Sequence, residues 1–299
     1  MLTPAPILLF VYNRLIYTRI TVESLKKNEF ASESELFIYS DAAKTEKDKK
    51  LVAEVRDYIG IVNGFRKVTI IEGDQNKGLA LSITSGVTEI LNKYDRAIIL
   101  EDDLELSPYF LKYMNEALTL YENENEVISI HGYVYPVKKK LPETFFLKGA
   151  DCWGWATWKR GWELYEDDAH TLFSEITSKN LKDEFDFNRS YPYTKMLKKQ
   201  IKGEINSWAI KWYASAFINN KVTLYPGRSL VRNIGTTESS THFEVTKVYE
   251  VDLSEDPVEV RKIEIKESTQ AKKMFEEYFR SINPGIVKKG LKKIKTLLR

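Results

Sequence analysis

Over roughly its first 132 residues, the sequence alternates short runs rich in β-branched residues with stretches whose apolar residues recur at helical spacing. We expect strands at residues 7–12, 35–40, 67–72, 96–100 and 127–131. A helix expected over residues 78–93 places five apolar side chains on one stripe, namely Leu79, Ile83, Val87, Ile90 and Leu91. Strand, helix, strand units of this kind build an open, mainly parallel α/β sheet.

The alternation stops near residue 132, and the rest of the chain is organised differently. Pro136, the lysine run at 138–140 and Pro142 predict an exposed connection. All six tryptophans fall between Trp153 and Trp212, and we expect this second half to pack closely on the first. The predicted organisation is an α/β half at residues 1–132, a second half at 133–283 and a basic tail at 284–299.

Charge is distributed unevenly along the chain. The 299 residues include 45 Lys and Arg against 43 Asp and Glu, a formal net charge of +2. Six of the basic residues lie in residues 286–299, which hold no acid, so the remainder has 39 basic against 43 acidic residues and a net charge of −4. A slightly acidic body lacks the broad basic face of a nucleic-acid-binding protein, so we expect no nucleic-acid partner.

Cysteine use and hydropathy bear on the compartment. Cys152 is the single cysteine and cannot form an intramolecular disulfide, which agrees with a reducing compartment. The apolar run at residues 6–12 follows no basic residue and is too short to cross a bilayer. We therefore expect a cytoplasmic protein without a signal peptide or transmembrane anchor.

Three consecutive carboxylates, Glu101, Asp102 and Asp103, follow the fourth expected strand. They repel one another, and Ser107 already serves as the expected N-cap of the next helix, with Pro108 at its first position. A bound Mn²⁺ or Mg²⁺ would explain them, because such ions take one or two carboxylates and fill their other positions with phosphate oxygens and water. The pattern indicates a metal site for a diphosphate ligand, with a solvated acidic turn as the alternative.

Three segments resemble nucleotide-sugar glycosyltransferases of the GT-A fold: residues 10–14 on the first strand, 76–79 opening a helix, and 98–110 around the acidic motif. The likeness is greatest to the N-acetylglucosaminyltransferase I type and to related bacterial sugar transferases. The resemblance implies a Rossmann-like, open, mainly parallel sheet with a closely packed acceptor-side lobe.

The resemblance also implies roles for individual residues. Asp103 would bind a Mn²⁺ that bridges the nucleotide diphosphate, and Asp102 and Glu101 would contact ribose or sugar hydroxyls. The other donor-binding residues would be Tyr12, Asn13, Arg14, Asp41, Asn76, Lys77 and Gly78. From the residues alone, a helix cap also explains Asp41, and a plain turn also explains residues 76–78.

Residues 151–158 resemble the acceptor-side stretch of the same transferases. Aromatic faces pack against the apolar faces of sugar rings, so Trp153, Trp155 and Trp208 are candidate acceptor-binding residues. Packing is the alternative, because two pairs of tryptophans stand four residues apart, as neighbours on a helix do: Trp158 with Trp162, and Trp208 with Trp212.

An inverting transfer needs a carboxylate that takes the proton of the acceptor hydroxyl. The family supplies it from an acidic pair just before a tryptophan, where this sequence has Asn206 and Ser207. Asparagine cannot act as a general base, so Asp151 and Glu204 are the candidates for that role.

Residues 233–243 resemble the family's late loop, which closes over the donor. Gly, Ser and Thr in this segment are compatible with a mobile lid, and closure would exclude water. His242 is expected to reach the metal or the diphosphate, with a structural or exposed histidine as the alternative.

Residues 286–299 have an amphipathic pattern. On a helical wheel of about 100° per residue, six apolar residues fall within an arc of roughly 140° and the six basic residues lie on the other side. This predicts a helix that lies on an anionic membrane surface, which suits a cytoplasmic-face enzyme with a lipid-linked acceptor. A helix that docks on the protein body or joins subunits is the alternative.

These features together predict a metal-dependent, inverting glycosyltransferase that moves a hexosyl or N-acetylhexosaminyl group. The donor would be a nucleoside diphosphate sugar, expected to be a UDP-sugar, and the acceptor a carbohydrate or lipid-linked glycan. A nucleotidyltransferase is disfavoured because residues 1–20 contain no glycine for a phosphate loop. The alternative from another class is a non-catalytic carbohydrate-binding or scaffolding protein, which the missing acidic pair favours.

Overall fold

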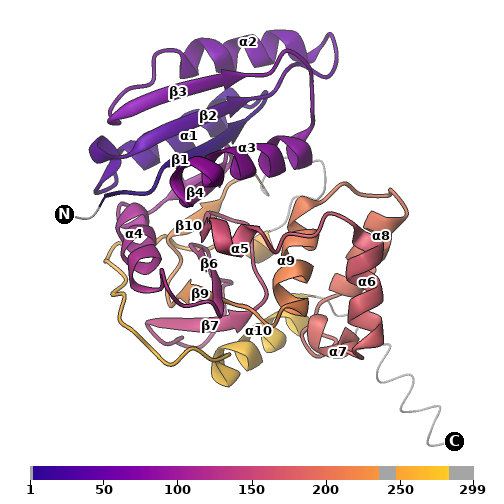
Figure 1. The fold of residues 1–299 in the computed structure, drawn as a ribbon. Coiled ribbons are helices and arrows are strands. Elements are labelled where there is room, and N and C mark those ends of the chain that lie inside the picture. Colours follow the sequence, from indigo (N-terminus) through magenta and orange to yellow (C-terminus); the bar gives the residue numbers. More distant parts are fainter. Residues whose placement is uncertain (1–2, 236–246, 283–299) are drawn as a thin grey trace, which may run out of the picture.

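The computed structural model describes residues 3–235 and 247–282 of the chain. Eight strands form one central sheet (Figure 1): β1 Ile7–Val11, β2 Glu35–Ser40, β3 Lys67–Glu72, β4 Arg96–Glu101, β6 Val127–His131, β7 Thr144–Lys148, β8 Trp155–Trp158 and β9 Val222–Pro226. Their order across the sheet is β3-β2-β1-β4-β8-β6-β9-β7. Six strands run in one direction, and β7 and β8 are antiparallel to their neighbours.

All five predicted strands are present, and the predicted open, mainly parallel α/β sheet is confirmed. β2, β3 and β6 have the predicted bounds, β1 ends one residue earlier, and β4 extends by one residue to Glu101. The strands added after residue 132 join the same sheet, so the second half of the chain continues the sheet of the first.

Helices cover both faces of the sheet. Successive side chains of β1 point to opposite faces, and each set packs against a different group of helices. Ile7 and Leu9 pack in a core with α1 (Leu15–Lys26), α2 (Asp48–Ile59) and α4 (Phe110–Leu120). Leu8 and Phe10 pack in a second core with α3 (Leu79–Tyr94), α5 (Lys159–Trp162) and α9 (Trp208–Ile218). The molecule therefore has three layers, with the sheet between two sets of helices.

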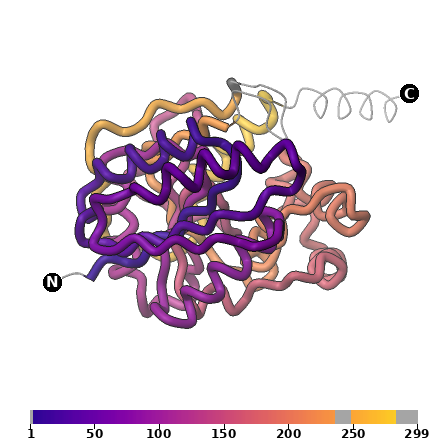
Figure 2. Tube along the Cα trace, turned by 90° about the horizontal axis from the view of Figure 1, so that it is seen from above, coloured from indigo at the N-terminus to yellow at the C-terminus, as the bar shows by residue number. Residues whose placement is uncertain are grey.

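The other described elements extend this framework. They are helices α6 Ala169–Ser178, α7 Lys182–Phe185, α8 Tyr193–Ile201 and α10 Thr269–Ile282, short turns η1 Ala31–Glu33 and η2 Lys247–Tyr249, and a two-stranded sheet of β5 Leu104–Leu106 with β10 Val231–Asn233. Figures 1 and 2 show α6 to α8 gathered on one side of the molecule. No helix within residues 3–235 and 247–282 is long and apolar enough to cross a membrane.

The helix after the acidic motif starts later than predicted. α4 begins at Phe110, so Pro108 is not its first residue. The Ser107 hydroxyl accepts a hydrogen bond from the Tyr109 amide at 3.3 Å and donates one to the Ser254 carbonyl at 2.7 Å. Ser107 is therefore a tertiary contact rather than the N-cap, because its hydroxyl joins two distant segments.

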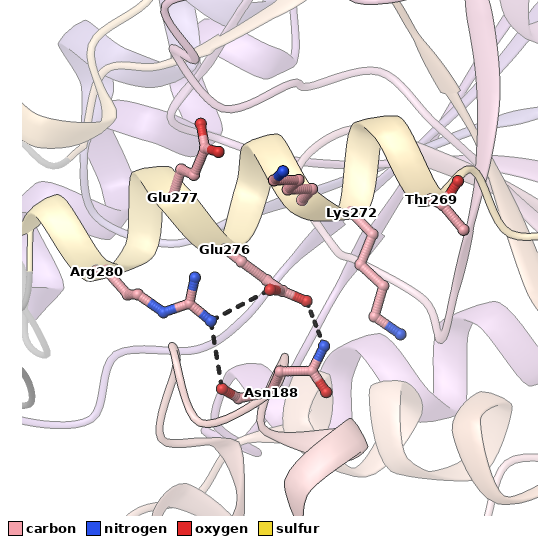
Figure 3. Close-up of a pocket in the computed structure, with 7 residues that line it drawn as sticks. Asn188, Thr269, Lys272, Glu276, Glu277 and Arg280 are labelled. Carbon is pink, nitrogen blue, oxygen red and sulfur yellow. Dashed lines mark hydrogen bonds and ion pairs between the residues drawn. The ribbon is translucent and has the colours of Figure 1, made fainter. Parts of the chain in front are cut away.

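A surface hollow of about 350 Å³ lies beside α10, and Figure 3 shows its charged lining. Glu276 accepts hydrogen bonds there from Asn188 Nδ2 at 2.6 Å and from an Arg280 guanidinium nitrogen at 3.2 Å. Among the residues that the structure describes, none of those predicted to bind donor, metal or acceptor lines this hollow. Most of its other charges are paired as well, Lys272 with Glu267 at 2.7 Å and Glu277 with Lys139 at 3.7 Å.

Candidate active site

The predicted donor residues lie at one edge of the sheet because β1, β2 and β4 are parallel neighbours. Val11 pairs with Ser40 of β2, and Phe10 pairs with Glu101 of β4. The residues that follow these strands therefore leave the sheet side by side. They are Tyr12, Asn13, Arg14, Asp41, Asp102 and Asp103.

Arg14 bridges two carboxylates of the acidic motif. Its guanidinium pairs with Asp102, and its second terminal nitrogen lies 3.0 Å from Asp103 Oδ2. Asp102 is only 3% exposed, and its Oδ2 atom has no hydrogen-bond partner in the described part of the chain. A buried carboxylate oxygen without a donor is rare in folded proteins and calls for an explanation.

The local charge balance is unfavourable without a further cation. Burial raises the pKa of Glu101 to about 8, and the charges of Asp103 and Asp102 add to this effect. Burial also raises the pKa of Asp102, although Arg14 opposes the shift. Thus a single guanidinium group, that of Arg14, is the nearby counter-ion for three acidic side chains at the end of β4.

The motif fits a metal that arrives with a diphosphate. The described ranges contain no group of three His, Cys, Asp or Glu side chains that could hold a metal ion by themselves. Mg²⁺ and Mn²⁺ do not need one, since one or two carboxylates suffice when phosphate oxygens and water supply the other ligands. The unpartnered Asp102 oxygen and the raised carboxyl pKa values agree with such a cation at Asp103 and its neighbours.

The start of the predicted lid loop packs against this motif. The Ile234 amide donates to the Asp103 carbonyl at 2.9 Å. At Gly235, a Cβ atom would overlap Asp103 Oδ2, so any larger residue would displace the carboxylate or the loop. The rest of the loop, residues 236–243 with His242, lies outside the described residues, as does the tail at 284–299.

Asp41 is not the cap of a helix, because α2 begins only at Asp48. Its Oδ1 accepts from the amides of Ala42 at 2.9 Å and Lys77 at 3.0 Å. Its Oδ2 accepts from Asn76 Nδ2 at 3.1 Å and the Gly78 amide at 2.8 Å. A carboxylate has about four acceptor positions, so Asp41 is saturated and orders the turn at residues 76–78.

The neighbouring donor-side residues are also held in place. The Tyr12 hydroxyl accepts from the Lys44 amide at 2.9 Å, and Asn13 Nδ2 donates to Asp48 Oδ1 at 3.0 Å. Gly78 has φ +73°, a conformation that favours glycine, and directly precedes the first residue of α3. These contacts give the loops beyond β1 and β2 a defined shape.

Asp151 lies after β7, at the end of a turn that requires glycine. Gly149 has φ +94°, and a Cβ there would overlap the Tyr213 ring. Asp151 Oδ1 accepts from the Cys152 amide at 2.9 Å, and Oδ2 accepts from the Tyr135 hydroxyl at 3.3 Å. The Asp151 side chain is 21% exposed, so a ligand can reach it.

Cys152 connects the two candidate sites electrostatically. Burial raises the pKa of its thiol well above the usual range, and the charges of Asp151, Glu101 and Asp103 add to this effect. The thiol therefore lies within electrostatic reach of both Asp151 and the acidic motif. β8 begins at Trp155, which pairs with Ile99 of the antiparallel β4, so the residues just before β8 lie near the end of β4 that carries the acidic motif.

Glu204 is an exposed residue on the loop after α8, and its carboxylate lies 3.9 Å from Lys202 Nζ. Ser207 caps α9, since its hydroxyl accepts from the Ile210 amide at 3.4 Å. Asn206 is exposed beside it. Ser207 thus has a structural role where the family has an acid.

The sequence model of the family described as "Glycosyl transferase family 2" matches residues 7–190, which is more than half of the 299 residues. The chain belongs to glycosyl transferase family 2. The match includes β1, the acidic motif and Asp151. Comparison with curated protein sequences gives no match.

Three solved structures align with most of this chain at low sequence identity. Residues 1–349 of S. aureus TarS share 11% identity, with 78% of this chain and 61% of that chain covered and a TM-score of 0.40. The mannosyltransferase PcManGT from Pyrobaculum calidifontis, in complex with GDP-Man and Mn²⁺, shares 10%, with 73% and 71% covered and a TM-score of 0.36. GalNAc-T7 with UDP, GalNAc and Mn²⁺ shares 11%, with 75% and 43% covered and a TM-score of 0.46. This chain spans less than two thirds of the TarS chain.

Family 2 membership and the sheet topology confirm the GT-A fold that the resemblance implied. The narrower likeness to the N-acetylglucosaminyltransferase I type stays a prediction. In this family 2 chain the acidic motif ends β4 and borders the loops after β1 and β2, which is the arrangement expected from the sequence.

The tryptophans of this family 2 chain differ from expectation. Trp155 is 1% exposed and Trp208 is 3% exposed, and the two rings stack on each other at 5.5 Å. They therefore pack the core and present no free face to a sugar, so their assignment as acceptor-binding residues is corrected. Trp158 ends strand β8 while Trp162 lies in α5, so helical spacing does not explain that pair.

Trp153 differs from these buried rings because it is partly exposed and packs edge-on against Tyr133 and Tyr249, with ring centroids 4.8 and 5.6 Å away. Sequence reasoning missed the tyrosines around Asp151 and the buried His131 beside it. His131 is the last residue of a predicted strand, so the rule that ligands bind beyond strand ends would have found it.

Proposed function

We propose that this family 2 glycosyltransferase moves a hexosyl or N-acetylhexosaminyl group from a UDP-sugar to a hydroxyl group of a carbohydrate or lipid-linked glycan, with inversion and with a divalent metal. The observation that carries the proposal is the arrangement at the end of β4. There, Arg14 meets two of three adjacent carboxylates, and Asp102 keeps a buried oxygen without a partner. Such a site is prepared for a cation and a diphosphate together.

On the donor side, Asp103 would hold Mn²⁺ or Mg²⁺, with His242 as a second ligand expected from the sequence. The bound ion would offset the charge that develops on the leaving diphosphate. Arg14 would then be released toward the diphosphate, and Asp102 and Glu101 would accept hydrogen bonds from ribose or sugar hydroxyls.

The nucleoside would lie against the loops after β1 and β2, on Tyr12 and Asn13. The turn at residues 76–78 would border it, and Asp41 would act by ordering that turn, because its own acceptor positions are filled.

On the acceptor side, Asp151 would take the proton of the attacking hydroxyl. Its partial exposure and the shared influence of Asp151 and the acidic motif on Cys152 support this choice. Glu204 remains the alternative base, on an exposed loop. Trp153 would pack against the acceptor sugar, since its ring is partly exposed next to Asp151 in the chain.

A screen of nucleotide sugars by thermal unfolding tests the donor assignment. A ligand that binds only the folded state raises the melting temperature. We expect UDP-sugars to do so in the presence of Mn²⁺ and not with a chelator, and GDP-sugars to have a smaller effect. Stabilisation that is independent of the metal would contradict the proposed metal role.

Release of UDP without added acceptor separates the enzyme from the non-catalytic alternative. We expect slow, Mn²⁺-dependent hydrolysis of the stabilising UDP-sugar, with water as the acceptor. Tight binding of the sugar nucleotide without any turnover, with or without a panel of glycan acceptors, would instead favour the carbohydrate-binding or scaffolding protein.

The tail sequence at residues 286–299 supports one further part of the proposal. Its six basic residues and no acid would hold the enzyme on an anionic cytoplasmic membrane surface, where lipid-linked glycans are found.

A further inference from the structure

His131, the last residue of β6, has a buried imidazole ring. Its side chain is 0% exposed, and neither ring nitrogen has a hydrogen-bond partner in the described part of the chain. Orphaned polar groups of this kind are uncommon in protein interiors. The position of the ring therefore calls for an explanation beyond packing.

The charged group facing this ring is Asp151, whose Oδ2 atom lies 3.8 Å from His131 Nε2. This distance exceeds that of a hydrogen bond, but a shift of less than about 1 Å would form one. Burial lowers the pKa of His131 to about 4, although Asp151 opposes the shift. The imidazole is therefore neutral at pH 7 and carries one N–H group.

The two oxygens of Asp151 have different surroundings. Oδ2 lies on the buried side, where the Tyr135 hydroxyl donates to it at 3.3 Å and His131 Nε2 faces it. Oδ1 accepts one hydrogen bond, from the Cys152 amide at 2.9 Å. Since a carboxylate oxygen has two lone pairs, Oδ1 retains one for a ligand.

We propose that His131 is a positioning residue for Asp151, donating its Nε2–H to Oδ2 so that Oδ1 receives the acceptor's proton. The inference rests on the proposed function, in which Asp151 is the base. As the acceptor oxygen bonds to the anomeric carbon, its proton moves to Oδ1. The bond from that carbon to the diphosphate oxygen breaks, and its electron pair leaves with the diphosphate. His131 neither gains nor loses a proton.

Several titratable groups face Asp151 from the elements around it, and all of them are neutral at pH 7. They are His131 on β6, Tyr133 and Tyr135 in the segment after it, Cys152, Tyr191, Tyr193, Tyr213 on α9, Tyr225 on β9 and Tyr249 on η2. The side chains that face Asp151 Oδ2, Tyr135 and His131, are therefore neutral donors. The loss of one such donor should shift the pH dependence of proton transfer.

Replacing His131 by glutamine and by asparagine gives a matched test. The side-chain nitrogen of glutamine can occupy the position of His131 Nε2, and the side-chain nitrogen of asparagine cannot. Turnover is measured as Mn²⁺-dependent UDP release from the stabilising UDP-sugar, with water as the acceptor. We expect His131→Gln to keep the wild-type pH profile of kcat. His131→Asn and His131→Leu should lower kcat by about 10- to 100-fold, with unchanged donor affinity and the acidic limb moved to higher pH. Superimposable profiles for all three variants would overturn the inference.

Asp151→Asn, measured in parallel, separates the two levels of the proposal. If this variant keeps wild-type turnover, Asp151 is not the base, and the role of His131 fails with it. If its turnover falls by about 10²–10⁴-fold while the His131 variants behave like wild type, only the role of His131 fails.

A second measurement needs no turnover. In ¹⁵N spectra of histidine-labelled protein, we expect His131 as the neutral Nε2–H tautomer, with an Nε2 signal that shifts in Asp151→Asn. The Nδ1–H tautomer would overturn the inference, because Nε2 could not then donate to Asp151.

Discussion

Arg14 acts as an internal counter-ion for the acidic motif. It pairs with both Asp102 and Asp103, the residues that a cation and a donor hydroxyl are proposed to engage. A ligand that brings its own positive charge would replace these contacts and free the guanidinium for the diphosphate. The donor-free protein is therefore stabilised by an ion pair that the donor complex does not need.

This arrangement predicts that Arg14→Gln destabilises the metal-free protein, by about 1–3 kcal/mol, because it leaves a buried charged group with too few partners. Mn²⁺ with UDP should restore part of the loss. Chemical unfolding with chelator, and then with Mn²⁺ and UDP, measures both effects. Arg189→Gln is the matched control, since that arginine pairs with Asp183 at an exposed site, where ion pairs contribute little to stability. Equal effects of the two substitutions would contradict the account of Arg14.

The raised pKa of Glu101 predicts how stability depends on pH. The folded state holds this proton up to about pH 8, whereas the unfolded chain releases it near 4.5, so the folded state binds more protons between these values. The free energy of unfolding of the metal-free protein should therefore have a component that falls as pH rises from about 4.5 to about 8. Glu101→Gln should remove that component. Equilibrium unfolding across this range measures it, and identical pH profiles for the variant and the wild type would count against it.

At the scale of elements, the sequence predicted the strands that border the proposed donor side, and it did not predict the strands after residue 132 that border the proposed acceptor side. Apolar runs flanked by turn residues located β1 to β4 and β6, and parallel pairing then brought the acidic motif beside Arg14. The acceptor side depends on β7, β8 and β9, whose neighbours in the sheet are distant in sequence. Local periodicity carries no information about such pairing.

The tryptophan cluster shows the same limit. β8 is buried along its whole length, so its sequence lacks the alternation that marks a half-exposed strand. From the sequence alone, Trp155 can therefore be interpreted as a ligand contact. In the structure its ring stacks on Trp208 in the core. His131 and Tyr135 could likewise be placed beside Asp151 only once β6 and the turn after β7 were positioned in space.

The packing of β10 and the following residues on the acidic motif predicts a specific effect at Gly235. Gly235→Ala should weaken donor binding by about 10-fold or more, because the new methyl group would overlap Asp103 Oδ2, and overpacking typically costs about 1–3 kcal/mol. Its effect on binding should exceed that of Gly60→Ala at the end of α2, where the nearest atom to a Cβ is 3.3 Å away. Calorimetric titration with UDP and Mn²⁺ compares the variants. Wild-type affinity in Gly235→Ala would mean that the loop does not constrain the carboxylate.

At the scale of the whole molecule, one sheet and one of its cores run through both predicted halves. Residues from β1 and from β9 belong to the same hydrophobic cluster. The proposed donor and acceptor sides are thus joined by shared packing. We expect residues 1–132 expressed alone to lack the stability of the full chain, because three of the eight strands of the central sheet come from later residues.

The basic tail supplies a prediction for the intact protein on membranes. The full chain should sediment with vesicles containing anionic lipid, and a version ending at Asn283 should not, because each basic residue near such a surface contributes about 1 kcal/mol. Binding should fall at high salt and be absent with neutral vesicles. Donor affinity should be the same for both versions. Equal sedimentation of the two would contradict membrane attachment through residues 284–299.

The central claim, a metal-dependent donor site at the acidic motif, is tested most directly by calorimetric titration of UDP in the presence and absence of Mn²⁺, on the wild type, Asp103→Asn and Asp57→Asn. Asp57 is an exposed carboxylate on α2 and serves as the control. We predict Mn²⁺-dependent binding in the wild type and in Asp57→Asn, and its loss in a folded Asp103→Asn protein. Unchanged Mn²⁺-dependent binding of UDP by folded Asp103→Asn would contradict the account.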